Sequence, residues 1–210
     1  MTGLFITLEG GEGAGKSTLL KGLRAHLQSC GIEPVLTREP GGTPFGEAAR
    51  KLFLARDYGA LCAEAELLLV FAARAQHVHE VIAPALAGGR CVIADRFTDA
   101  SYAYQGGGRG QPVERIRALE AWTTDNLAPD LTLLLDIPTT LGRERIDGRA
   151  PRDRIEREAD AFFHRVREAY RARAAAEPER FCLIDASQSA DEVLARAVAA
   201  IDCLLEARST

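Results

Sequence analysis

The sequence predicts an α/β fold in which a five-stranded parallel sheet is flanked by helices. Short apolar runs rich in β-forming residues alternate along the chain with longer segments whose apolar residues have helical spacing, as in βαβ units. The 210 residues contain 47% hydrophobic and 27% charged residues, which is typical of a globular protein with a sizeable core. We therefore expect a single domain over residues 1–210.

The predicted strands are short apolar runs that end at glycine, proline or polar residues. The first run is followed at once by glycines, and the third follows the pair Gly88 and Gly89. The expected strands are 4–8, 33–37, 91–94, 131–135 and 181–184.

Helical spacing predicts helices over 18–29, 46–54, 63–86 and 191–206, with further helices in the gaps. The stretch 67–73 is apolar on every face, which indicates a helix that is buried all round or meets another subunit. We expect a homodimer on this basis.

Residues 143–157 are dense in charge, contain Gly148 and Pro151, and lack a long apolar run. This composition predicts a mobile, arginine-rich loop between the fourth strand and the next helix.

Composition also excludes several classes of protein. The net charge of −4 argues against nonspecific electrostatic binding to nucleic acid. No apolar run approaches the ~20 residues needed to cross a bilayer, and the N-terminus lacks the pattern of a signal peptide. Five scattered cysteines without a CxxC pair indicate reduced, buried thiols rather than disulfides or a zinc site. We therefore expect a cytoplasmic protein without nucleic-acid or membrane partners.

Residues 10–17 read GGEGAGKS and match the phosphate-binding pattern G-x-x-x-x-G-K-[ST]. Glycines let backbone N–H groups curl around phosphate oxygens, and the helix that follows presents its positive end. An accidental glycine-rich turn is the alternative, but the predicted strand before the pattern and the helix after it favour a P-loop NTPase fold. The expected ATP-binding residues here are Gly10, Gly11, Gly13, Ala14, Gly15, Lys16, Ser17 and Thr18.

The rest of the chain narrows the class of enzyme. A guanine-reading N-K-x-D loop, which a GTPase needs, is missing from the sequence. The arginine-rich segment 143–157 suggests instead a nucleotide or nucleoside kinase, because a closing cationic lid excludes water and stabilises the charge of phosphoryl transfer.

Four further features carry a specific resemblance: Glu12 inside the P-loop, TREPGGT at 37–43, DRF at 95–97 and YQG at 104–106. Together with the segment 143–157 they resemble the thymidylate kinase family, in its bacterial type that keeps catalytic arginines in the lid. The resemblance runs from residue 4 to about residue 185. It implies transfer of the γ-phosphoryl group of ATP to dTMP, with Mg²⁺ as cofactor.

The resemblance also implies roles on the acceptor side. Arg38, Arg96 and Arg50 would hold the dTMP phosphate, and Glu12 would hold the sugar 3′-hydroxyl. Arg74, Ser101 and Gln105 would read the base, while Tyr104 would crowd the 2′ position. We consider a cis peptide at Glu39–Pro40, which would place Pro40 in the dTMP site and aim Arg38. For Arg50 a solvated helix face remains an alternative.

The base-stacking position departs from the family pattern. The family has an aromatic residue four positions before the arginine, where this chain has Val70. We assign Phe71, the next residue, to the dTMP site, which requires a slight rotation of the helix. The alternative is that Phe71 belongs to the core and that aliphatic contact at Val70 replaces stacking.

On the donor side, Lys16 would bridge the β- and γ-phosphates, and Ser17 and Asp95 would hold the metal. An N-cap is the alternative role for Asp95. The resemblance places Arg143 on adenine and offers Arg149, Arg152 and Arg154 for the transition state. The resulting catalytic set is Glu12, Lys16, Asp95, Arg96, Arg149, Arg152 and Arg154.

Three other functions compete with this interpretation. A kinase of another nucleoside monophosphate would share most of the motifs. A deoxynucleoside kinase would need a general base for a neutral hydroxyl and would have less use for both Arg38 and Arg96. A non-enzymatic ATP-binding regulator would need no acceptor-site arginines.

Overall fold

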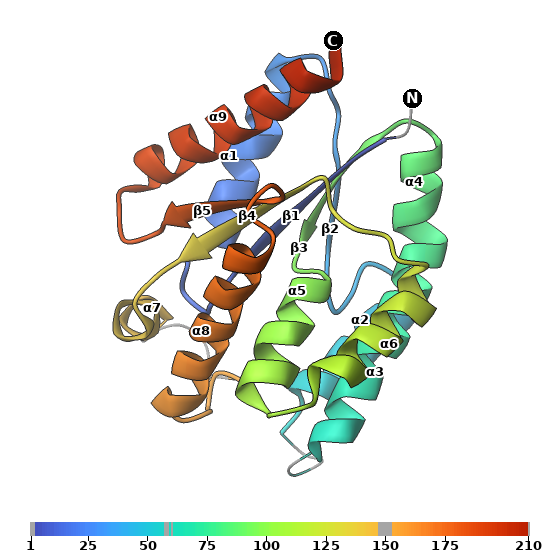
Figure 1. Cartoon of the computed structure of the whole chain (residues 1–210), viewed down its shortest axis with the longest axis vertical. Helices are drawn as coiled ribbons and strands as arrows, with labels where there is room; N and C mark the ends of the chain where they lie inside the picture. The colour runs from blue at the N-terminus through green and yellow to red at the C-terminus, as the bar shows by residue number, and fades with distance from the viewer. Residues whose placement is uncertain (1–2, 57–58, 60, 147–152, 210) are drawn as a thin grey trace.

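The computed structural model describes residues 3–56, 59, 61–146 and 153–209, and within them five parallel strands form one sheet in the order β2-β3-β1-β4-β5 (Figure 1). Each predicted strand is present, with small differences at its ends. The strands are β1 (Leu4–Gly10), β2 (Val35–Arg38), β3 (Cys91–Asp95), β4 (Leu131–Asp136) and β5 (Phe181–Asp185).

Helices connect the strands on both sides of the sheet, and the predicted helices are present. They are α1 (Lys16–Ser29), α2 (Pro44–Leu54), α3 (Ala63–His77), α4 (Ala83–Ala87), α5 (Thr98–Ser101), α6 (Val113–Thr124), α7 (Thr139–Ile146), α8 (Asp160–Ala176) and α9 (Ala190–Ser209). Two π-helical segments, Val78–Ile82 and Tyr102–Gly108, continue α3 and α5. None of the helices in the described part of the chain is long and apolar enough to cross a membrane.

Two sequence-based expectations need correction. The segment 63–86 is helical throughout but not one α-helix, because the π-helical residues Val78–Ile82 separate α3 from α4. Pro84 lacks an N–H and its ring crowds the preceding turn, which explains a change of helix type just before it. The expected loop 143–157 also begins as helix, since α7 continues to Ile146. Residues 147–152 lie outside the described residues.

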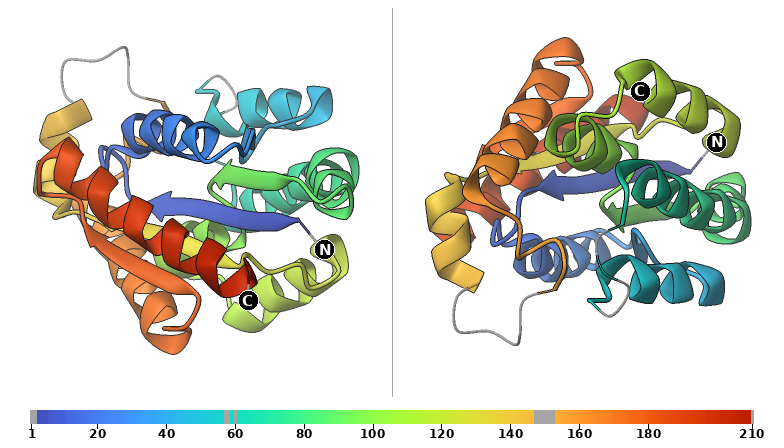
Figure 2. Two further views of the ribbon diagram at one scale, coloured as in Figure 1. Left: turned by 90° about the horizontal axis from the view of Figure 1, so that it is seen from above. Right: turned by 90° about the horizontal axis from the view of Figure 1, so that it is seen from below.

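The alternation of side chains along β1 decides which helices cover which face. Leu4, Ile6 and Leu8 pack with α1 and α9 in the largest apolar cluster, so these two helices cover one face (Figure 2). Phe5 points the other way and packs with residues of β3 and of the segment 78–82. The opposite face is completed by α8, which contacts β4 and β5.

The register of the strands brings three chemically important segments to one edge of the sheet. Leu8 of β1 pairs with Asp95 of β3, and Asp95 pairs with Arg38 of β2. The glycine-rich loop, the TREPGGT loop and the Asp95–Phe97 turn therefore leave the same carboxyl edge, where open α/β sheets bind their ligands.

We expect the cysteine thiols to react in two groups, because their exposure differs. Cys30, Cys62 and Cys203 are exposed, Cys182 is half-buried and Cys91 is buried, so the expected burial of the thiols is wrong for the three exposed ones. Burial raises the pKa of the Cys91 thiol to about 11, which keeps it protonated and unreactive. Titration of the native protein with a chromogenic disulfide reagent should modify the three exposed thiols rapidly, and Cys91 should react only after urea is added. Rapid modification of Cys91 in the native protein would contradict the packing of β3.

Candidate active site

A cleft of about 690 Å³ lies at the carboxyl edge of the sheet. The glycine-rich loop, the loop after β2, the end of β3 and the first turn of α9 contribute to its walls. Most of the predicted site residues line it. They are Glu12, Gly13, Ala14, Gly15, Lys16, Ser17, Thr18, Arg38, Pro40, Arg50, Arg74, Asp95, Arg96, Ser101, Tyr104 and Gln105.

The glycine-rich loop closes around the Lys16 ammonium group. Its Nζ donates to the carbonyl oxygens of Gly10 and Gly11, both at 3.2 Å, so these two glycines hold the lysine rather than line the cleft. Gly13 has a φ of 73°, and a Cβ there would lie 2.0 Å from the Gly142 carbonyl oxygen. Only glycine fits this contact, which packs the loop against α7.

Arg96 links the glycine-rich loop to the other side of the cleft. Its φ of 73° is unusual for a residue with a side chain, and its N–H donates to Leu8 O at 2.9 Å. Its guanidinium donates to Gly10 O at 2.9 Å and to Glu12 Oε1 at 2.8 Å. Such backbone strain concentrates at functional sites, and here it aims a guanidinium at the phosphate-binding loop.

Glu12 stays ionised despite its surroundings. Burial by itself would raise the pKa of its carboxyl, but the Arg96 and Lys16 charges and a hydrogen bond from Tyr104 lower it below the ordinary value. The Tyr104 hydroxyl donates to Glu12 Oε1 at 3.0 Å, and the Arg96 guanidinium lies 4.8 Å from the centre of the Tyr104 ring. Glu12, Arg96 and Tyr104 thus form one interlocked group.

Arg74 is 1% exposed and is oriented by three hydrogen bonds. Its Nε donates to Glu39 Oε2 at 2.7 Å, its Nη1 to Ser101 Oγ at 3.0 Å and its Nη2 to Phe97 O at 3.0 Å. The Glu39 carboxylate is also in contact with His77 Nδ1 at 3.0 Å. Because the guanidinium is fixed on both sides, Arg74 presents one defined edge to the cleft.

Phe71 lies away from the cleft, and Val70 takes its place. Phe71 is buried in a cluster with Leu67 and Ile116, and the Arg74 guanidinium sits 4.5 Å from its ring centre. The assignment of Phe71 to the dTMP site is therefore corrected: the ring supports Arg74 from the core side. Val70 lines the cleft together with Phe53 of α2.

Arg143 also lies away from the main cleft. It pairs with Asp160, donates to Glu158 O at 3.2 Å and lies over the Phe163 ring. Arg145 lines the cleft instead and donates to Ala186 O at 2.9 Å. Residues two positions apart on a helix point to different sides, so helix α7 turns Arg143 away from the position expected for an adenine contact.

The end of β2 and helix α2 carry a second group of positive charge. Arg38 pairs with Glu47 at 2.9 Å, and Arg50 Nη1 donates to Pro40 O at 3.1 Å. The Glu39–Pro40 peptide bond is cis, as we considered. Arg50 lines the cleft rather than a solvated helix face.

In the lid segment, the structure describes Arg154 but not Arg149 or Arg152, which lie outside the described residues. Arg154 donates to Glu66 Oε2 and to Phe53 O, both at 2.8 Å, and its neighbours Asp153 and Ile155 line the cleft. Arg154 itself is held beside the cleft and not in it.

Glu66 is fully buried and collects several donors. Gln105 Nε2 donates to it at 2.9 Å and Arg109 Nε at 3.2 Å, in addition to Arg154. This single carboxylate therefore connects a predicted base-reading residue with a predicted lid arginine.

Asp95 has the features of a cation ligand. Its Oδ1 is buried without a hydrogen-bond partner among the described residues, and Ser17 lines the same cleft. Carboxylate and hydroxyl oxygens are the ligands that Mg²⁺ prefers, so the donors present fit this metal.

Four residues that shape the site escaped sequence reasoning. Glu39 lies inside the TREPGGT motif, so the motif could have indicated that Glu39 belongs to the site. No sequence signal pointed to the other three residues, Phe53, Glu66 and Tyr170. Each belongs to a helical segment, where the spacing of apolar residues indicates only which positions are buried. Tyr170 contacts Arg96 Nη1 at 3.1 Å from a position 74 residues away in the chain.

Comparison with known proteins agrees with this geometry. The family model described as thymidylate kinase matches residues 8–197. A thymidylate kinase from Pseudomonas syringae pv. syringae is 56% identical over 98% of this chain and 96% of its own length. One from Pseudomonas entomophila is 55% identical over the same shares. The crystal structure of thymidylate kinase from Ehrlichia chaffeensis superposes with a TM-score of 0.78 at 30% identity, covering 96% of this chain and 99% of the other.

Because the ion pair between Arg74 and Glu39 is buried, we expect its loss to lower the free energy of unfolding strongly. Glu39→Gln leaves the Arg74 charge buried without its counter-ion, and such a loss typically costs about 3–5 kcal/mol. We expect urea denaturation to show a decrease of that order in the free energy of unfolding.

Glu47→Gln is the matched control, since Glu47 and Arg38 form an exposed pair with side chains 40% and 53% accessible. Exposed pairs contribute about 0–1 kcal/mol. Equal destabilisation by the two substitutions would contradict the assigned role of Glu39.

Proposed function

The chain belongs to the thymidylate kinase family, and we propose that its cleft transfers the γ-phosphoryl group of ATP to dTMP, giving ADP and dTDP. The observation that carries this proposal is that one cleft holds both the glycine-rich loop and three arginines, Arg38, Arg50 and Arg96. The glycine-rich loop binds the polyphosphate of ATP. The phosphate of dTMP must lie close to it, and the three arginines offset the repulsion between the two anions.

On the donor side, the loop N–H groups and the start of α1 bind the β- and γ-phosphates. Lys16 exchanges its two carbonyl contacts for phosphate oxygens, because the carbonyls of Gly10 and Gly11 are weaker partners than an anion. Ser17 and Asp95 would hold Mg²⁺, which supplies charge neutralisation at the phosphates when bound.

On the acceptor side, the dTMP phosphate is a dianion that must lie close to the ATP phosphates. Arg96 and Arg38 orient it through bidentate hydrogen bonds, and Arg50 adds a third charge. Burial and the charges of Arg38 and Arg96 lower the pKa of Arg50. Arginine nevertheless stays protonated in proteins, so the three positive charges persist and offset the repulsion between the two anions.

The base and sugar contacts follow from the interlocked groups described above. Arg74 donates to a thymine carbonyl from its fixed edge, with Ser101 and Gln105 beside it. Tyr104 is held by Glu12 and occupies the space that a 2′-hydroxyl would need, which selects deoxyribose. In place of the missing aromatic at Val70, we propose that Phe53 supplies the apolar wall for the base.

At the adenine end we propose Arg145 in place of Arg143. Arg145 of α7, Gln188 just before α9 and Leu194 of α9 line one part of the cleft. A planar guanidinium beside apolar side chains suits a purine ring.

Arg154 is the lid arginine whose resting contacts are described. We propose that it leaves Glu66 when both substrates are bound and reaches the transferring phosphoryl group, together with Arg149 and Arg152. Because these guanidinium groups meet charge that develops during transfer, they lower the barrier more than they strengthen binding. The phosphoryl group passes directly between the two phosphates, without a covalent enzyme intermediate.

We also propose that the chain forms one kinase domain, with a lid at about 143–157, and works as a homodimer in the cytoplasm. Leu68 on α3 is 57% exposed and Trp122 on the neighbouring helix α6 is 83% exposed, which supports an apolar subunit contact. The described cysteines are free thiols, which supports a reducing compartment. Light scattering at several protein concentrations would test the dimer.

An ADP-release assay across the nucleoside monophosphates tests the acceptor assignment. We expect turnover with dTMP and Mg²⁺ to exceed that with the other deoxynucleotides and with the ribose counterpart of dTMP. Comparable rates with a different nucleotide would favour another kinase, and ATP binding without acceptor-dependent turnover would favour a regulator.

Lys16→Ala should abolish most turnover, because Lys16 carries the charge that bridges the transferring phosphates. Removing one such group costs about 10²–10³ in kcat. Lys21→Ala is the matched control, since Lys21 is exposed on the same helix. Steady-state kinetics should show a large loss for the first variant only, with both variants giving native circular dichroism spectra. Near-normal turnover in a folded Lys16→Ala variant would contradict the assignment.

Arg154→Ala should lower kcat about 10-fold to 100-fold, with little change in the KM for ATP. This loss is smaller than the ~10³–10⁵ in kcat that a full arginine finger contributes, because Arg149 and Arg152 partly substitute for Arg154. Arg171→Ala, which removes an exposed arginine of α8, is the control. The triple substitution of Arg149, Arg152 and Arg154 should approach the full range. A triple variant that changes only the KM for ATP would show that the lid is a binding clamp.

A further inference from the structure

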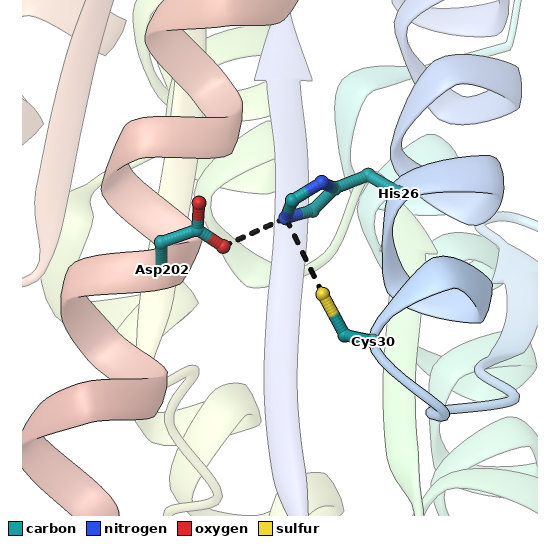
Figure 3. A group of neighbouring side chains, drawn as sticks. All are labelled: His26, Cys30 and Asp202. Carbon is teal, nitrogen blue, oxygen red and sulfur yellow. Dashed lines mark hydrogen bonds and ion pairs between the residues drawn. The ribbon is translucent and has the colours of Figure 1, made fainter.

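The structure brings together three side chains of types that bind metal ions, and the proposed kinase reaction does not use them. His26 and Cys30 come from the last turn and the end of α1, and Asp202 comes from α9 (Figure 3). One donor atom of each side chain lies within 4.8 Å of the others. We propose that these three residues form a zinc site that fastens the end of α1 to α9.

The donor atoms of Asp202 and Cys30 both approach the same ring nitrogen of His26. His26 Nε2 lies 2.7 Å from Asp202 Oδ1 and 3.9 Å from Cys30 Sγ. A nucleophilic triad would use both ring nitrogens, one for the carboxylate and one for the thiol. Here both partners approach Nε2, as they do when three ligands surround a common ion.

The spacing on the chain also suits a metal. His26 in the last turn of α1 and Cys30 at its C-cap are four residues apart, so their side chains lie on the same side of the helix end. Asp202 faces them because α1 and α9 pack against each other on one side of the sheet. The site therefore joins two helices that are remote in sequence but adjacent in the fold.

The donor set selects the ion. Thiolate, imidazole and carboxylate together suit Zn²⁺, with bonds of about 2.3, 2.0–2.1 and 2.0–2.2 Å, whereas Mg²⁺ and Ca²⁺ prefer oxygen ligands. Drawing the three atoms onto one ion requires only small rotations, since their separations already fall within 4.8 Å. Cys30 is exposed, so an ion can enter from solvent and a water molecule can complete the tetrahedron.

Zinc binding here has a defined proton balance. The Cys30 thiol loses its proton to solvent. The His26 ring gives up its Nε2 proton to solvent and takes one on Nδ1, so that Nε2 offers its lone pair to the ion and the ring stays neutral. The hydrogen bond between Nε2 and Asp202 is replaced by two metal–ligand bonds. No oxidation or reduction takes place.

The site is expected to act on stability and not on turnover. His26 lies ten residues after Lys16, which is ~15 Å along the helix, so the ion is remote from the phosphates. An ion that binds only the folded chain raises its stability by mass action. At a zinc concentration 100 times the dissociation constant, the unfolding temperature should rise by about 5–10 °C.

The test is a titration of Zn²⁺ alone into the full chain, without nucleotide and after treatment with a chelator. We expect one Zn²⁺ per chain by calorimetry and a rise in unfolding temperature. Co²⁺ in place of Zn²⁺ should give the near-ultraviolet absorption of a thiolate–cobalt bond. Cys30→Ser should remove this absorption, and Cys30→Ser, His26→Gln and Asp202→Asn should each weaken binding about tenfold or more.

Cys203→Ser is the matched control, because Cys203 is an exposed thiol next to Asp202 and lies outside the group. It should leave zinc binding unchanged. Absence of saturable binding would show that His26 and Asp202 form a simple interhelical hydrogen bond, and would overturn the proposal. Binding that survives Cys30→Ser, or is lost in Cys203→Ser, would overturn it as well.

Discussion

The site depends on the position of the Arg96 guanidinium. The backbone of Arg96 is held in a left-handed conformation, and its N–H bonds to Leu8 O in the neighbouring strand. From there the side chain reaches Gly10 O and Glu12, so it fixes the glycine-rich loop relative to the end of β3. In the proposed function the loop binds one phosphate group and Arg96 the other, so this one contact would set their separation. The strain at Arg96 is tolerated because its backbone and side-chain contacts all support the same conformation.

The positive charges in and beside the cleft pair with carboxylates, of which Glu39 and Glu66 are buried and Glu12 is half-buried. Glu12 pairs with Arg96, Glu39 with Arg74, and Glu66 with Arg154. Each carboxylate also orients its arginine, so the same contacts serve stability and recognition. Glu9 has a different role: burial and the Asp99 carboxylate raise its pKa to about 8, and it accepts hydrogen bonds from Phe97 N–H and from the Tyr170 hydroxyl.

The fold and much of the cleft were predictable from sequence because their signals are local. Alternating apolar runs gave the strands and helices, and the P-loop pattern specifies backbone geometry within eight consecutive residues. Arg38, Asp95 and Arg96 were also placed at the cleft, since Arg38 and Asp95 end strands, Arg96 follows one, and parallel strands end at one edge of the sheet. Phe71 and Arg143 were assigned wrongly to the cleft, because a rotation of one or two helix positions changes which side a residue faces, and periodicity does not resolve it.

The sequence by itself determined the α/β class, the phosphate-binding loop and the resemblance to the thymidylate kinase family, since these depend on short-range patterns and on motifs that stay contiguous. Only the tertiary structure decided which partners meet across the chain. It placed Glu66 against Arg154, Phe53 beside Val70, and Asp202 against His26. Such pairs are separated by many residues, and their contact follows from how helices pack on the sheet. Packing is a property of the whole chain, so no local pattern encodes it.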